Sequence, residues 1–367
     1  MKPDTEQQLA TLVANANGPV QINGGGTRPI GRPVQGDHLT TSGLSGITLY
    51  DPGALTIVAQ AGTPVADIDA ALKAQNQRLA FEPMDHRALL GTNGTPTIGG
   101  VAAGNISGPR RIAVGACRDF LLGVRFVDGM GQIVKNGGRV MKNVTGYDLV
   151  KLMAGSYGTL GIMTEVALKV LPDVESTATL TLSGLDDVTA IKAMSKALGS
   201  PFDITGAAHT ADGQTTLRIE GFKGSVAYRA AQLQSHLNTF GSVAVDFDDT
   251  TTWDAIRDVT AFADATGDVW RISTRPSLAA ALAAKTNAIK LQYDWGGGLI
   301  WALVREGHDI RQNLGDFEGH ATLVRASQST REKVTPFQPE PAPLAAISNG
   351  LRAKFDPRGI LNPGLMN

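Results

Sequence analysis

The stretch GTNGTPTIGGVAAGNISGPRR, residues 91–111, decides how the first half of the chain is interpreted, because it is dense in glycine and contains no acidic residue. Without a Cβ, glycine lets backbone N–H groups point outward in turns that other residues block. Successive outward N–H groups form a concave nest that binds phosphate oxygens, particularly near the start of a helix. Arg110 and Arg111 end the stretch, and these two residues, like Arg28 earlier in the chain, could either add positive charge or be solvated. The stretch predicts a backbone cradle for an anion.

Two further glycine-dense segments lie in the same half, NGGGTR at residues 23–28 and GSYGTLGI at residues 155–162. Glycine accounts for 43 of the 367 residues, well above the roughly 7% that is usual. A single loop of this kind is equally well explained as a tight turn. Three of them, each beside an apolar run typical of a strand, favour a cofactor that contains a diphosphate.

The common nucleotide-binding motifs are missing from these loops. A Rossmann fold needs GxGxxG between its first strand and helix, and none of the three loops has that spacing. The chain also contains neither GKS nor GKT, so the lysine of a P-loop is absent. NAD in a Rossmann fold and ATP on a P-loop are therefore poor fits.

Length and composition predict a two-domain globular protein. The chain has 42% hydrophobic and 18% charged residues and a formal net charge of −1, so no strong field attracts nucleic acid or an anionic membrane. We find no apolar run long enough to span a membrane. The N-terminal MKPDTEQQLATLV carries acidic residues and is unlike a secretory signal. We expect a cytoplasmic protein.

Cysteine and histidine usage limits the metal chemistry of the chain. Cys117 is the only cysteine, so the chain forms no internal disulfide and cannot hold an iron–sulfur cluster by itself. The six histidines never occur at a metal-ligand spacing such as HExxH. We expect no metal site, and we expect Cys117 to be a buried small apolar residue.

The order of predicted elements supports an α+β chain. Residues 120–135 predict a hairpin, and Pro64 predicts the start of a helix. After residue 175 strands and helices alternate with few glycine-rich loops, until the proline-rich stretch at residues 334–344. No internal repeat is evident.

Three motifs in order carry a family resemblance: residues 97–134, GYDLVKLMAGSYGTLGIMTEVALKVLP at 146–172, and FDPRGILNPGLM at 355–366. They resemble the FAD-binding (PCMH-type) domain of the vanillyl-alcohol oxidase and p-cresol methylhydroxylase superfamily. Within it, the chain is most similar to the smaller FAD-binding subunits of bacterial glycolate oxidases. The resemblance implies a PCMH-type FAD domain of two α/β subdomains at 1–175, an α+β cap domain at 176–330, and a linker with a C-terminal segment returning to the FAD domain at 331–367.

The resemblance also implies which residues contact FAD. Asp119 would brace the second loop, or merely cap its own turn, and Asn362 would reach back toward the flavin, or merely form a turn. The remaining implied contacts are Gly24, Gly25, Gly26 and Thr27 on one side of the pyrophosphate, Thr97, Ile98, Gly99 and Gly100 on the other, Ala103, Gly104, Asn105 and Gly108 along the flavin, and Gly158, Thr159, Gly161 and Ile162 at the adenosine end.

Two departures from the family pattern matter. Covalent members attach the flavin through a histidine in or near these loops, and the loops here contain none, so we expect noncovalent FAD. Relatives that oxidise 2-hydroxy acids carry an HGxxGDGNxH-type stretch, whereas the nearest candidate here, residues 315–324, contains His320 alone. We assign no catalytic residue from the sequence.

The resemblance implies a subunit of a glycolate oxidase complex, an FAD-dependent 2-hydroxy-acid oxidoreductase that converts glycolate to glyoxylate. Its partners would be a larger FAD-binding catalytic subunit and an iron–sulfur subunit. The complex would be cytoplasmic, or these partners would attach it to the inner membrane. A noncatalytic FAD relay or scaffold subunit remains open. So does an independent FAD-dependent oxidoreductase acting on another small substrate, whose anion would meet arginines such as Arg257, Arg271, Arg275 and Arg305.

Overall fold

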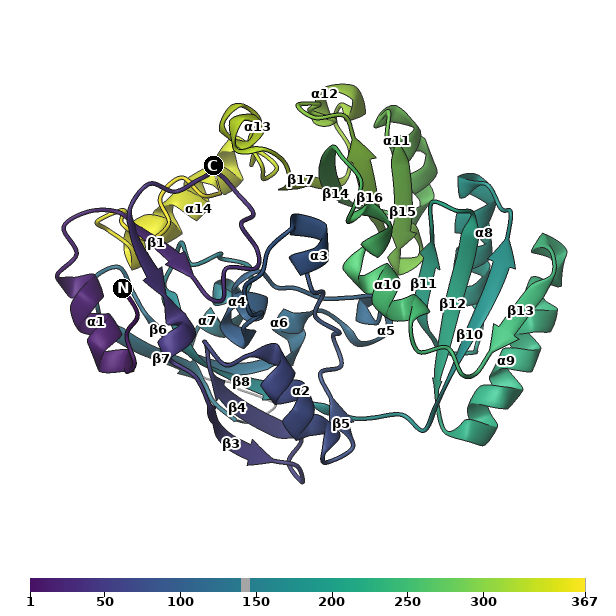
Figure 1. Cartoon of the computed structure of the whole chain (residues 1–367), viewed down its shortest axis with the longest axis horizontal. Helices are drawn as coiled ribbons and strands as arrows, with labels where there is room; N and C mark the ends of the chain where they lie inside the picture. The colour runs from purple at the N-terminus through teal and green to yellow at the C-terminus, as the bar shows by residue number, and fades with distance from the viewer. Residues whose placement is uncertain (140–145, 367) are drawn as a thin grey trace. The chain divides into compact units, whose positions relative to one another are not determined.

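The computed structural model describes residues 1–139 and 146–366, and it divides into two compact units (Figure 1). The first unit consists of Met1–Ser107, Ala116–Asp173 and Pro339–Asn367. The second unit consists of Val174–Gln338 together with the short segment Gly108–Gly115. The end of the glycine-rich stretch is thus part of the second unit, whereas the rest of the stretch is part of the first.

Five of the described strands form the main antiparallel sheet of the first unit, in the order β3-β4-β8-β6-β7. Strands β6 and β7 form the hairpin predicted at residues 120–135, with Val127 opposite Ile133. The strands of this sheet are β3 (Ile47–Asp51), β4 (Thr56–Gln60), β6 (Leu121–Val127), β7 (Ile133–Gly137) and β8 (Ile162–Lys169).

The C-terminal segment returns to the first strand of the chain. Val20 forms a parallel bridge with Leu361, and both side chains belong to a buried cluster that includes Leu9 and Val13 of the first helix. The small strands of this unit are β1 (Val20–Asn23) paired with β2 (Asp37–Thr40), and β5 (Gln77–Arg78) paired with β9 (Leu171–Pro172).

Helices of the first unit begin and end close to the signals in the sequence. The side chain of Thr5 caps the first helix by accepting from the N–H of Gln8, and Pro64 occupies the N-cap of the second helix, one residue earlier than predicted. The helices are α1 (Glu6–Ala14), η1 (Thr41–Gly43), α2 (Val65–Lys73), α3 (Arg87–Leu90), α4 (Ile98–Ala103), α6 (Cys117–Phe120), α7 (Leu149–Met153) and α14 (Ala342–Phe355).

Eight of the described strands form one antiparallel sheet in the second unit, in the order β13-β10-β12-β11-β15-β16-β14-β17. The first four in sequence are β10 (Ser176–Ser183), β11 (Ile204–His209), β12 (Gln214–Gly221) and β13 (Val243–Asp246). The last four are β14 (Asp268–Thr274), β15 (Lys290–Asp294), β16 (Leu299–Val304) and β17 (Gly319–Arg325).

This sheet is a structural duplication. Each set of four strands follows the order β-α-β-β-α-β along the chain, the ferredoxin-like arrangement, with α8 and α9 in the first half and α11 and α12 in the second. The second strand of each half, β11 and β15, joins the two halves through the pair His209 and Tyr293. Sequence analysis found no repeat, so this finding corrects it: the halves share a pattern of elements rather than of residues.

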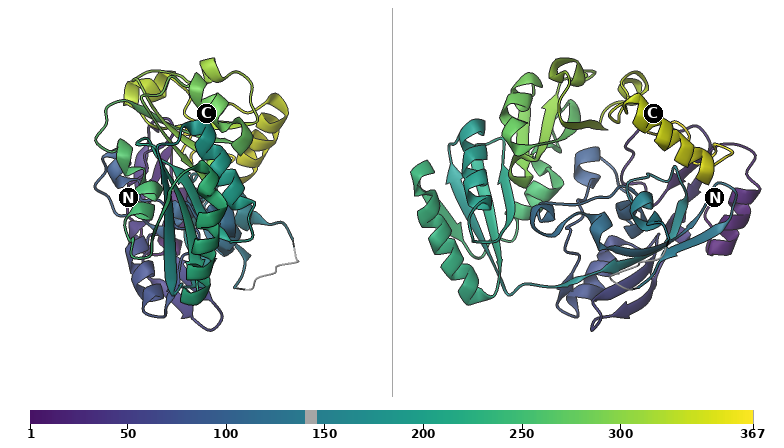
Figure 2. Two further views of the ribbon diagram at one scale, coloured as in Figure 1. Left: turned by 90° about the vertical axis from the view of Figure 1, so that its right-hand side faces the viewer. Right: turned by 180° about the vertical axis from the view of Figure 1, so that it is seen from behind.

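The two faces of the eight-stranded sheet differ in chemistry. Helices α8, α9 and α11 lie along one face, where they cover a large apolar core that includes Leu217, Trp270 and Ile300 (Figure 2). Because side chains alternate along a strand, Arg218 and Arg271 lie on the opposite face. The helices of this unit are α5 (Arg111–Val114), α8 (Asp187–Leu198), α9 (Lys223–Leu237), η2 (Asn238–Phe240), α10 (Thr252–Asp258), η3 (Thr260–Phe262), η4 (Pro276–Leu278), α11 (Ala279–Lys285), η5 (Trp295–Gly297), α12 (Arg311–Leu314) and α13 (Gln328–Lys333).

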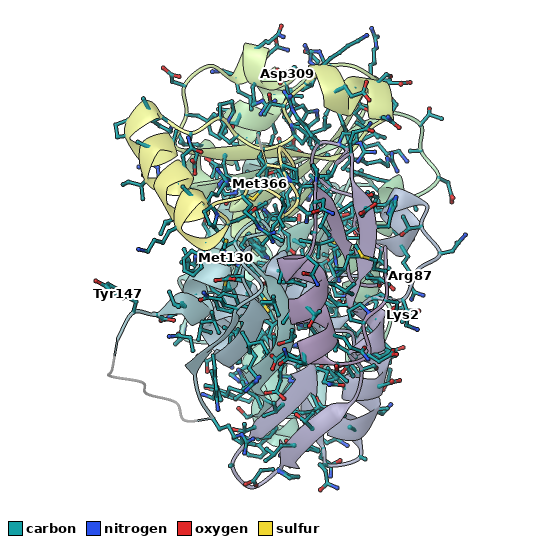
Figure 3. All side chains as sticks on the ribbon, turned by 90° about the vertical axis from the view of Figure 1, so that its left-hand side faces the viewer. Lys2, Arg87, Met130, Tyr147, Asp309 and Met366 are labelled. Atoms are coloured by element: carbon teal, nitrogen blue, oxygen red, sulfur yellow. The ribbon has the colours of Figure 1, made fainter. Side chains whose placement is uncertain are left out.

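Several apolar side chains remain on the surface of the first unit. Helix α14 lies wholly within the described residues, yet none of its side chains is buried, and Leu344 and Ile347 are more than half exposed. Tyr147 also points away from the unit, 87% exposed (Figure 3). Among the described residues, no helix combines the length and the apolar character needed to cross a membrane.

Candidate cofactor site

The three glycine-dense loops come together in the first unit. The N–H of Tyr157 in the third loop donates to the carbonyl of Ala103 at 3.0 Å, and Gly155 donates to Ala102 at 3.3 Å, so the second and third loops are joined through their backbones. The first loop is tied to the start of the second because the Thr92 hydroxyl donates to the carbonyl of Thr27 at 3.2 Å. Segments that are far apart in the sequence therefore form one surface.

Close backbone approach explains several of the glycines. A Cβ added at Gly25 would lie 1.6 Å from the carbonyl oxygen of Thr95, and one at Gly94 would lie 1.8 Å from that of Gly25. A Cβ at Gly24 would lie 2.4 Å from Oγ1 of Thr97. The first two loops thus pack backbone against backbone. Gly26, by contrast, has φ +72° and faces open space, since a Cβ there would meet nothing within 4 Å.

Helix α4 is fixed by the second loop. Thr97 caps it by accepting from the N–H of Gly100 at 3.3 Å, and the N–H of Gly99 donates to the carbonyl of Ala61 at 2.8 Å. A Cβ on Gly99 would lie 2.5 Å from that of Ala61, and Ile98 is fully buried. These residues hold the loop against the end of β4.

Arg28 is the charged group of this surface. Its Nη1 would lie 3.1 Å from a Cβ on Gly100, so the guanidinium reaches from the first loop to the second. Burial lowers its pKa to about 10, an effect opposed by Tyr157, Asp85 and Cys117. The side chain therefore remains protonated at neutral pH. Its Nε is buried and has no hydrogen-bond partner among the described residues, which is costly for a cation unless an anion binds there.

A second buried polar group lies in the third loop. Oγ of Ser156 has no hydrogen-bond partner in the described part of the chain, although the residue is buried. Together with Arg28 it offers donors to an oxyanion, so the residues present fit the diphosphate of FAD. The sequence indicated Arg28 as a possible source of positive charge, with solvation as the alternative, and it did not indicate Ser156. The available signal was their position directly inside NGGGTR and GSYGTLGI.

Asn362 connects the first and third loops. Its Oδ1 accepts from the N–H of Ile22 at 2.7 Å, and its Nδ2 donates to the carbonyl of Tyr157 at 2.9 Å. A Cβ on Gly158, which has φ +75°, would lie 3.1 Å from the same Nδ2. The side chain thus positions the strand that enters the first loop. Its predicted approach to the flavin stays a prediction.

Most of the other predicted residues shape the loops. Oδ2 of Asp119 accepts from the N–H of Ala116 at 2.9 Å, which makes it the local cap of α6, and Oδ1 of Asn105 accepts from the backbone N–H of Arg118 at 3.0 Å. The Thr159 hydroxyl donates to the backbone carbonyl of Ser156 at 2.7 Å. A Cβ added to Gly104 would meet the side chain of Ile106, and one added to Gly161 would meet that of Phe126. Ile162 lies in the buried cluster that contains Val20 of β1.

The end of the second loop belongs to the second unit. The carbonyl of Gly108 accepts from Nε1 of Trp295 at 3.0 Å. Arg110 is buried and forms a bidentate ion pair with Glu220, with distances of 2.9 and 2.8 Å. Arg111 stacks on the Trp295 ring, 4.4 Å from its centroid. Arg110 is therefore paired with a carboxylate of this unit, which the sequence did not indicate.

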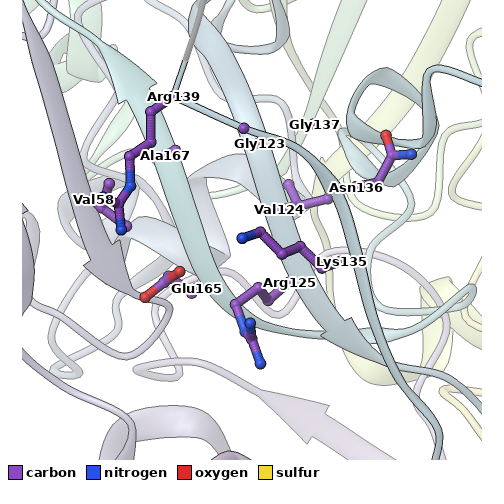
Figure 4. A pocket seen from close by; sticks show the side chains of 11 residues that line it. Val58, Gly123, Val124, Arg125, Lys135, Asn136, Gly137, Arg139, Glu165 and Ala167 are labelled. Carbon is purple, nitrogen blue, oxygen red and sulfur yellow. The ribbon is translucent and has the colours of Figure 1, made fainter. Parts of the chain in front are cut away.

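Neither the thiol nor a small surface hollow suggests other chemistry. Cys117 is fully buried, and burial raises the pKa of its thiol. A hollow of about 40 Å³ lies on the main sheet beside Arg125, Lys135 and Glu165 (Figure 4), far below the roughly 300 Å³ of ligand pockets. Within residues 1–139 and 146–366, no three His, Cys, Asp or Glu side chains are grouped as they would be around a metal ion.

Comparison with known proteins agrees with this surface. The model of an FAD binding domain matches residues 1–137. Among solved structures, an alkyldihydroxyacetonephosphate synthase superposes with a TM-score of 0.69 at 15% identity, covering 99% of this chain and 76% of that one. The predicted α+β fold with a PCMH-type FAD domain is thereby confirmed, and the cofactor is FAD.

Two sequence relatives differ in how much of this chain they match. The glycolate oxidase subunit GlcD of Bacillus subtilis is 32% identical over 180 residues, 48% of this chain and 37% of that protein. The glycolate oxidase subunit GlcE of Escherichia coli K12 is 36% identical over 357 residues, which are 95% of this chain and 92% of that protein. Similarity that extends from end to end at this level shows that the chain belongs to the same family of FAD-binding proteins as GlcE.

Proposed function

We propose that this chain is the FAD-binding subunit of a multi-subunit glycolate oxidase, which converts glycolate to glyoxylate. The observation that carries the proposal is the near full-length similarity to GlcE, in a chain whose three glycine loops meet beside the half-buried cation Arg28. The first unit would be the FAD domain. It comprises most of the predicted 1–175, without Gly108–Gly115, and the returning part of the predicted 331–367. The second unit would be the cap, predicted at 176–330.

Each part of the loop surface has a role in holding the cofactor. FAD, when bound, supplies an acceptor for the two electrons that leave a 2-hydroxy acid on oxidation. Glycines 24–26 and 99–100 let the backbone come close to a diphosphate. Arg28 provides the opposite charge, and Ser156 provides a hydroxyl donor. Asn362 keeps the first and third loops in register. In the absence of a histidine in these loops, the attachment is noncovalent.

The proposed partners follow from the chemistry that this chain lacks. Electrons from a flavin commonly pass to iron–sulfur clusters, and one cysteine cannot ligate a cluster. We therefore propose an iron–sulfur subunit and a larger FAD-binding catalytic subunit as partners, with the complex in the cytoplasm or held at the inner membrane through them. GlcD, a relative of this chain, is itself named as a glycolate oxidase subunit.

A noncatalytic relay is the second candidate. It is favoured by one observation, the isolation of His320 in the stretch where 2-hydroxy-acid oxidising relatives carry several polar groups. In that case the chain binds FAD and passes electrons, and a partner subunit removes the substrate's hydrogen.

The test uses the purified chain alone and the chain co-expressed with its partner subunits. Visible absorbance records bound flavin, and bleaching at about 450 nm on anaerobic addition of glycolate records reduction. Bleaching of the isolated chain assigns catalysis to it. Bleaching that requires the partners assigns the relay role. A purified complex that oxidises glycolate equally well after this chain is removed contradicts the proposal.

A further inference from the structure

The eight-stranded sheet of the second unit is open where its two halves meet. The pair His209 and Tyr293 joins β11 to β15. Directly after this pair the chain of β11 turns back at residues 210–214, where a backbone hydrogen bond of 2.9 Å closes the turn, whereas β15 extends three residues further. Within the described part of the chain, residues 290–292 therefore pair with β16 on one side and with no strand on the other. We call this opening, between residues 290–292 and the turn at 210–214, the seam.

A large hollow lies at the seam. Its volume is about 1100 Å³, which exceeds the roughly 300–1,000 Å³ of pockets for small molecules. Another wall comes from α10 and η3, and side chains of β15 hold it in place. Nε2 of Gln292 donates to the carbonyl of Ile256 at 2.8 Å, and Nζ of Lys290 donates to that of Ala261 at 3.2 Å, which engages the ammonium group of this edge. The hollow is thus built into the second unit and is large enough for a polypeptide segment.

The backbone of β15 forms one side of the hollow. In an antiparallel sheet, the N–H and C=O of one residue point to the same side of the strand, and those of the next residue point to the other side. At least one of residues 290–292 therefore directs both groups away from β16 and toward the seam. Backbone groups of a strand that lacks a neighbour are a template for a further strand.

The outer edges of the same sheet are protected in ways that the seam is not. At β17 the N–H of Leu323 donates to the carbonyl of Pro336 at 2.8 Å, so a later segment covers that edge. At the other end, β13 is only four residues long and is followed by Asp248 and Asp249, and short, charged edges resist further pairing. At the seam, by contrast, the apolar side chain of Ile289 directly before β15 is 57% exposed.

Two carboxylates face the hollow without a cationic partner. The carboxylate of Asp187 accepts from the Tyr293 hydroxyl at 2.7 Å and lies 3.6 Å from Nε2 of His209. Its pKa is lowered, chiefly by the hydrogen bond from His209, so it is ionised at neutral pH. Asp212 lies in the turn and accepts from the Thr210 hydroxyl. Among the described residues, neither carboxylate forms an ion pair with a lysine or arginine. The hollow therefore favours a basic side chain.

We propose that the seam binds an extended segment of a partner subunit, which pairs with β15 as an additional strand. This inference rests on the proposed function, which supplies the partner subunits, and it names the surface where one of them docks. Main-chain hydrogen bonds to β15 give the affinity of such a strand, and its side chains give the specificity. An apolar side chain of the segment covers Ile289, and a basic side chain meets the carboxylates of Asp187 and Asp212.

Hydrogen exchange resolved to single amides tests the proposal on the FAD-loaded chain, alone and in the complex obtained by co-expression with the two proposed partner subunits. We expect at least one amide of residues 290–292 to exchange about tenfold or more slowly in the complex, because a hydrogen-bonded amide exchanges only after its strand opens. Ile289→Lys should weaken assembly about tenfold or more, since it removes an apolar contact and adds a charge that repels the basic side chain of the segment. Biolayer interferometry between this chain and the purified partner subunits gives the dissociation constant.

The matched control is Tyr228→Lys, which makes the same change of charge at a side chain that is 66% exposed on α9 of the same unit. It should assemble as the unmodified chain does. Unchanged exchange of residues 290–292 in the complex overturns the proposal, and so does an Ile289→Lys variant that assembles no worse than Tyr228→Lys. Slowing that appears when the isolated chain is concentrated assigns the seam to a second copy and overturns the partner assignment. A chain that forms no complex contradicts the proposed function, whereas a complex with an unprotected seam contradicts only this inference.

Discussion

Asn362 accepts a hydrogen bond from the backbone N–H of Ile22 at 2.7 Å, although 340 residues separate the two in the sequence. The same side chain donates to Tyr157 at 2.9 Å. The residue is almost fully buried and adopts φ +45°. Through this single carboxamide the C-terminal segment holds the strand that enters the first glycine loop and the backbone of the third.

Replacing Asn362 with alanine should therefore weaken both the fold and the site. The change leaves the N–H of Ile22 and the carbonyl of Tyr157 without their partner, which costs about 1–3 kcal/mol of unfolding free energy. Urea unfolding followed by circular dichroism measures this loss, and dialysis measures FAD retention. Asn349→Ala on the exposed face of α14 is the control and should lower neither stability nor flavin content. Unchanged stability and flavin content in Asn362→Ala would show that the two hydrogen bonds of the carboxamide stabilise neither the fold nor the cofactor site.

Arg28→Met should separate cofactor binding from folding. Arg28 is a half-buried cation whose buried Nε has no partner among the described residues. This arrangement destabilises the cofactor-free chain, so replacing Arg28 by an uncharged side chain of similar length should not lower apoprotein stability. Affinity for FAD should fall about tenfold or more, because a charge-assisted contact is lost. Fluorescence titration with FAD and thermal unfolding of the apoprotein measure the two effects.

The matched control for Arg28 is Arg118→Met, since the Arg118 side chain is 52% exposed and lies just beyond the second loop. Its FAD affinity should remain that of the unmodified chain. If Arg28→Met bound FAD normally but unfolded more easily, Arg28 would be a structural residue.

Gly25→Ala should prevent the first two loops from packing. The new Cβ would lie 1.6 Å from the carbonyl oxygen of Thr95, and because that atom is backbone, the loops themselves must separate. We expect a loss of about 3 kcal/mol or more and loss of flavin. Gly350→Ala is the opposite case, because a Cβ there meets nothing within 4 Å inside α14, and it should stabilise the chain by about 0.5–1 kcal/mol. Equal melting temperatures for the two variants would contradict the steric argument.

Local signals in the sequence predicted the elements that depend on local chemistry. The hairpin of β6 and β7 follows from two β-rich runs joined by Asp128-Gly129-Met130-Gly131, and the start of α2 follows from Pro64. The three glycine loops were correctly identified as separate segments because glycine density is itself local. Their convergence on one surface was predicted by family resemblance.

Features that depend on distant partners could not be predicted in this way. Arg110 belongs to a basic run that looks like a solvated surface, and its buried pair with Glu220 lies 110 residues away. Arg28 was one of three arginines that could supply charge or be solvated, and only its buried, unpartnered Nε distinguished it. Ser156 became a candidate only because its buried Oγ has no partner among the described residues. The duplication in the second unit escaped notice because its two halves share an order of elements and not a pattern of residues. The corresponding strands β11 and β15 pair with each other at His209 and Tyr293.

The lowered pKa of Asp187 determines how the stability of the second unit should depend on pH. Its carboxylate accepts from the Tyr293 hydroxyl at 2.7 Å and lies 3.6 Å from Nε2 of His209. The pKa of Asp187 is lowered, chiefly by the hydrogen bond from His209, against the opposing effect of burial. In the unfolded chain the group titrates near pH ~3.9. Because the folded pKa lies below this value, the stabilisation is present in full above pH ~4 and is lost as pH falls through the folded pKa.

Asp187→Asn should therefore be less stable than the unmodified chain at pH 7, by less than about 1 kcal/mol because the carboxylate is partly exposed to solvent. The difference should begin to shrink as the pH falls below ~4 and should vanish once the pH is below the folded pKa of Asp187, where the unmodified side chain is protonated as well. Thermal unfolding from pH 3 to 8 measures it, with Asp203→Asn, whose side chain is 87% exposed, as the control. A difference between Asp187→Asn and the unmodified chain that stays constant down to pH 3 would show that the substitution acts through packing, because only the ionised carboxylate can lose its advantage on acidification.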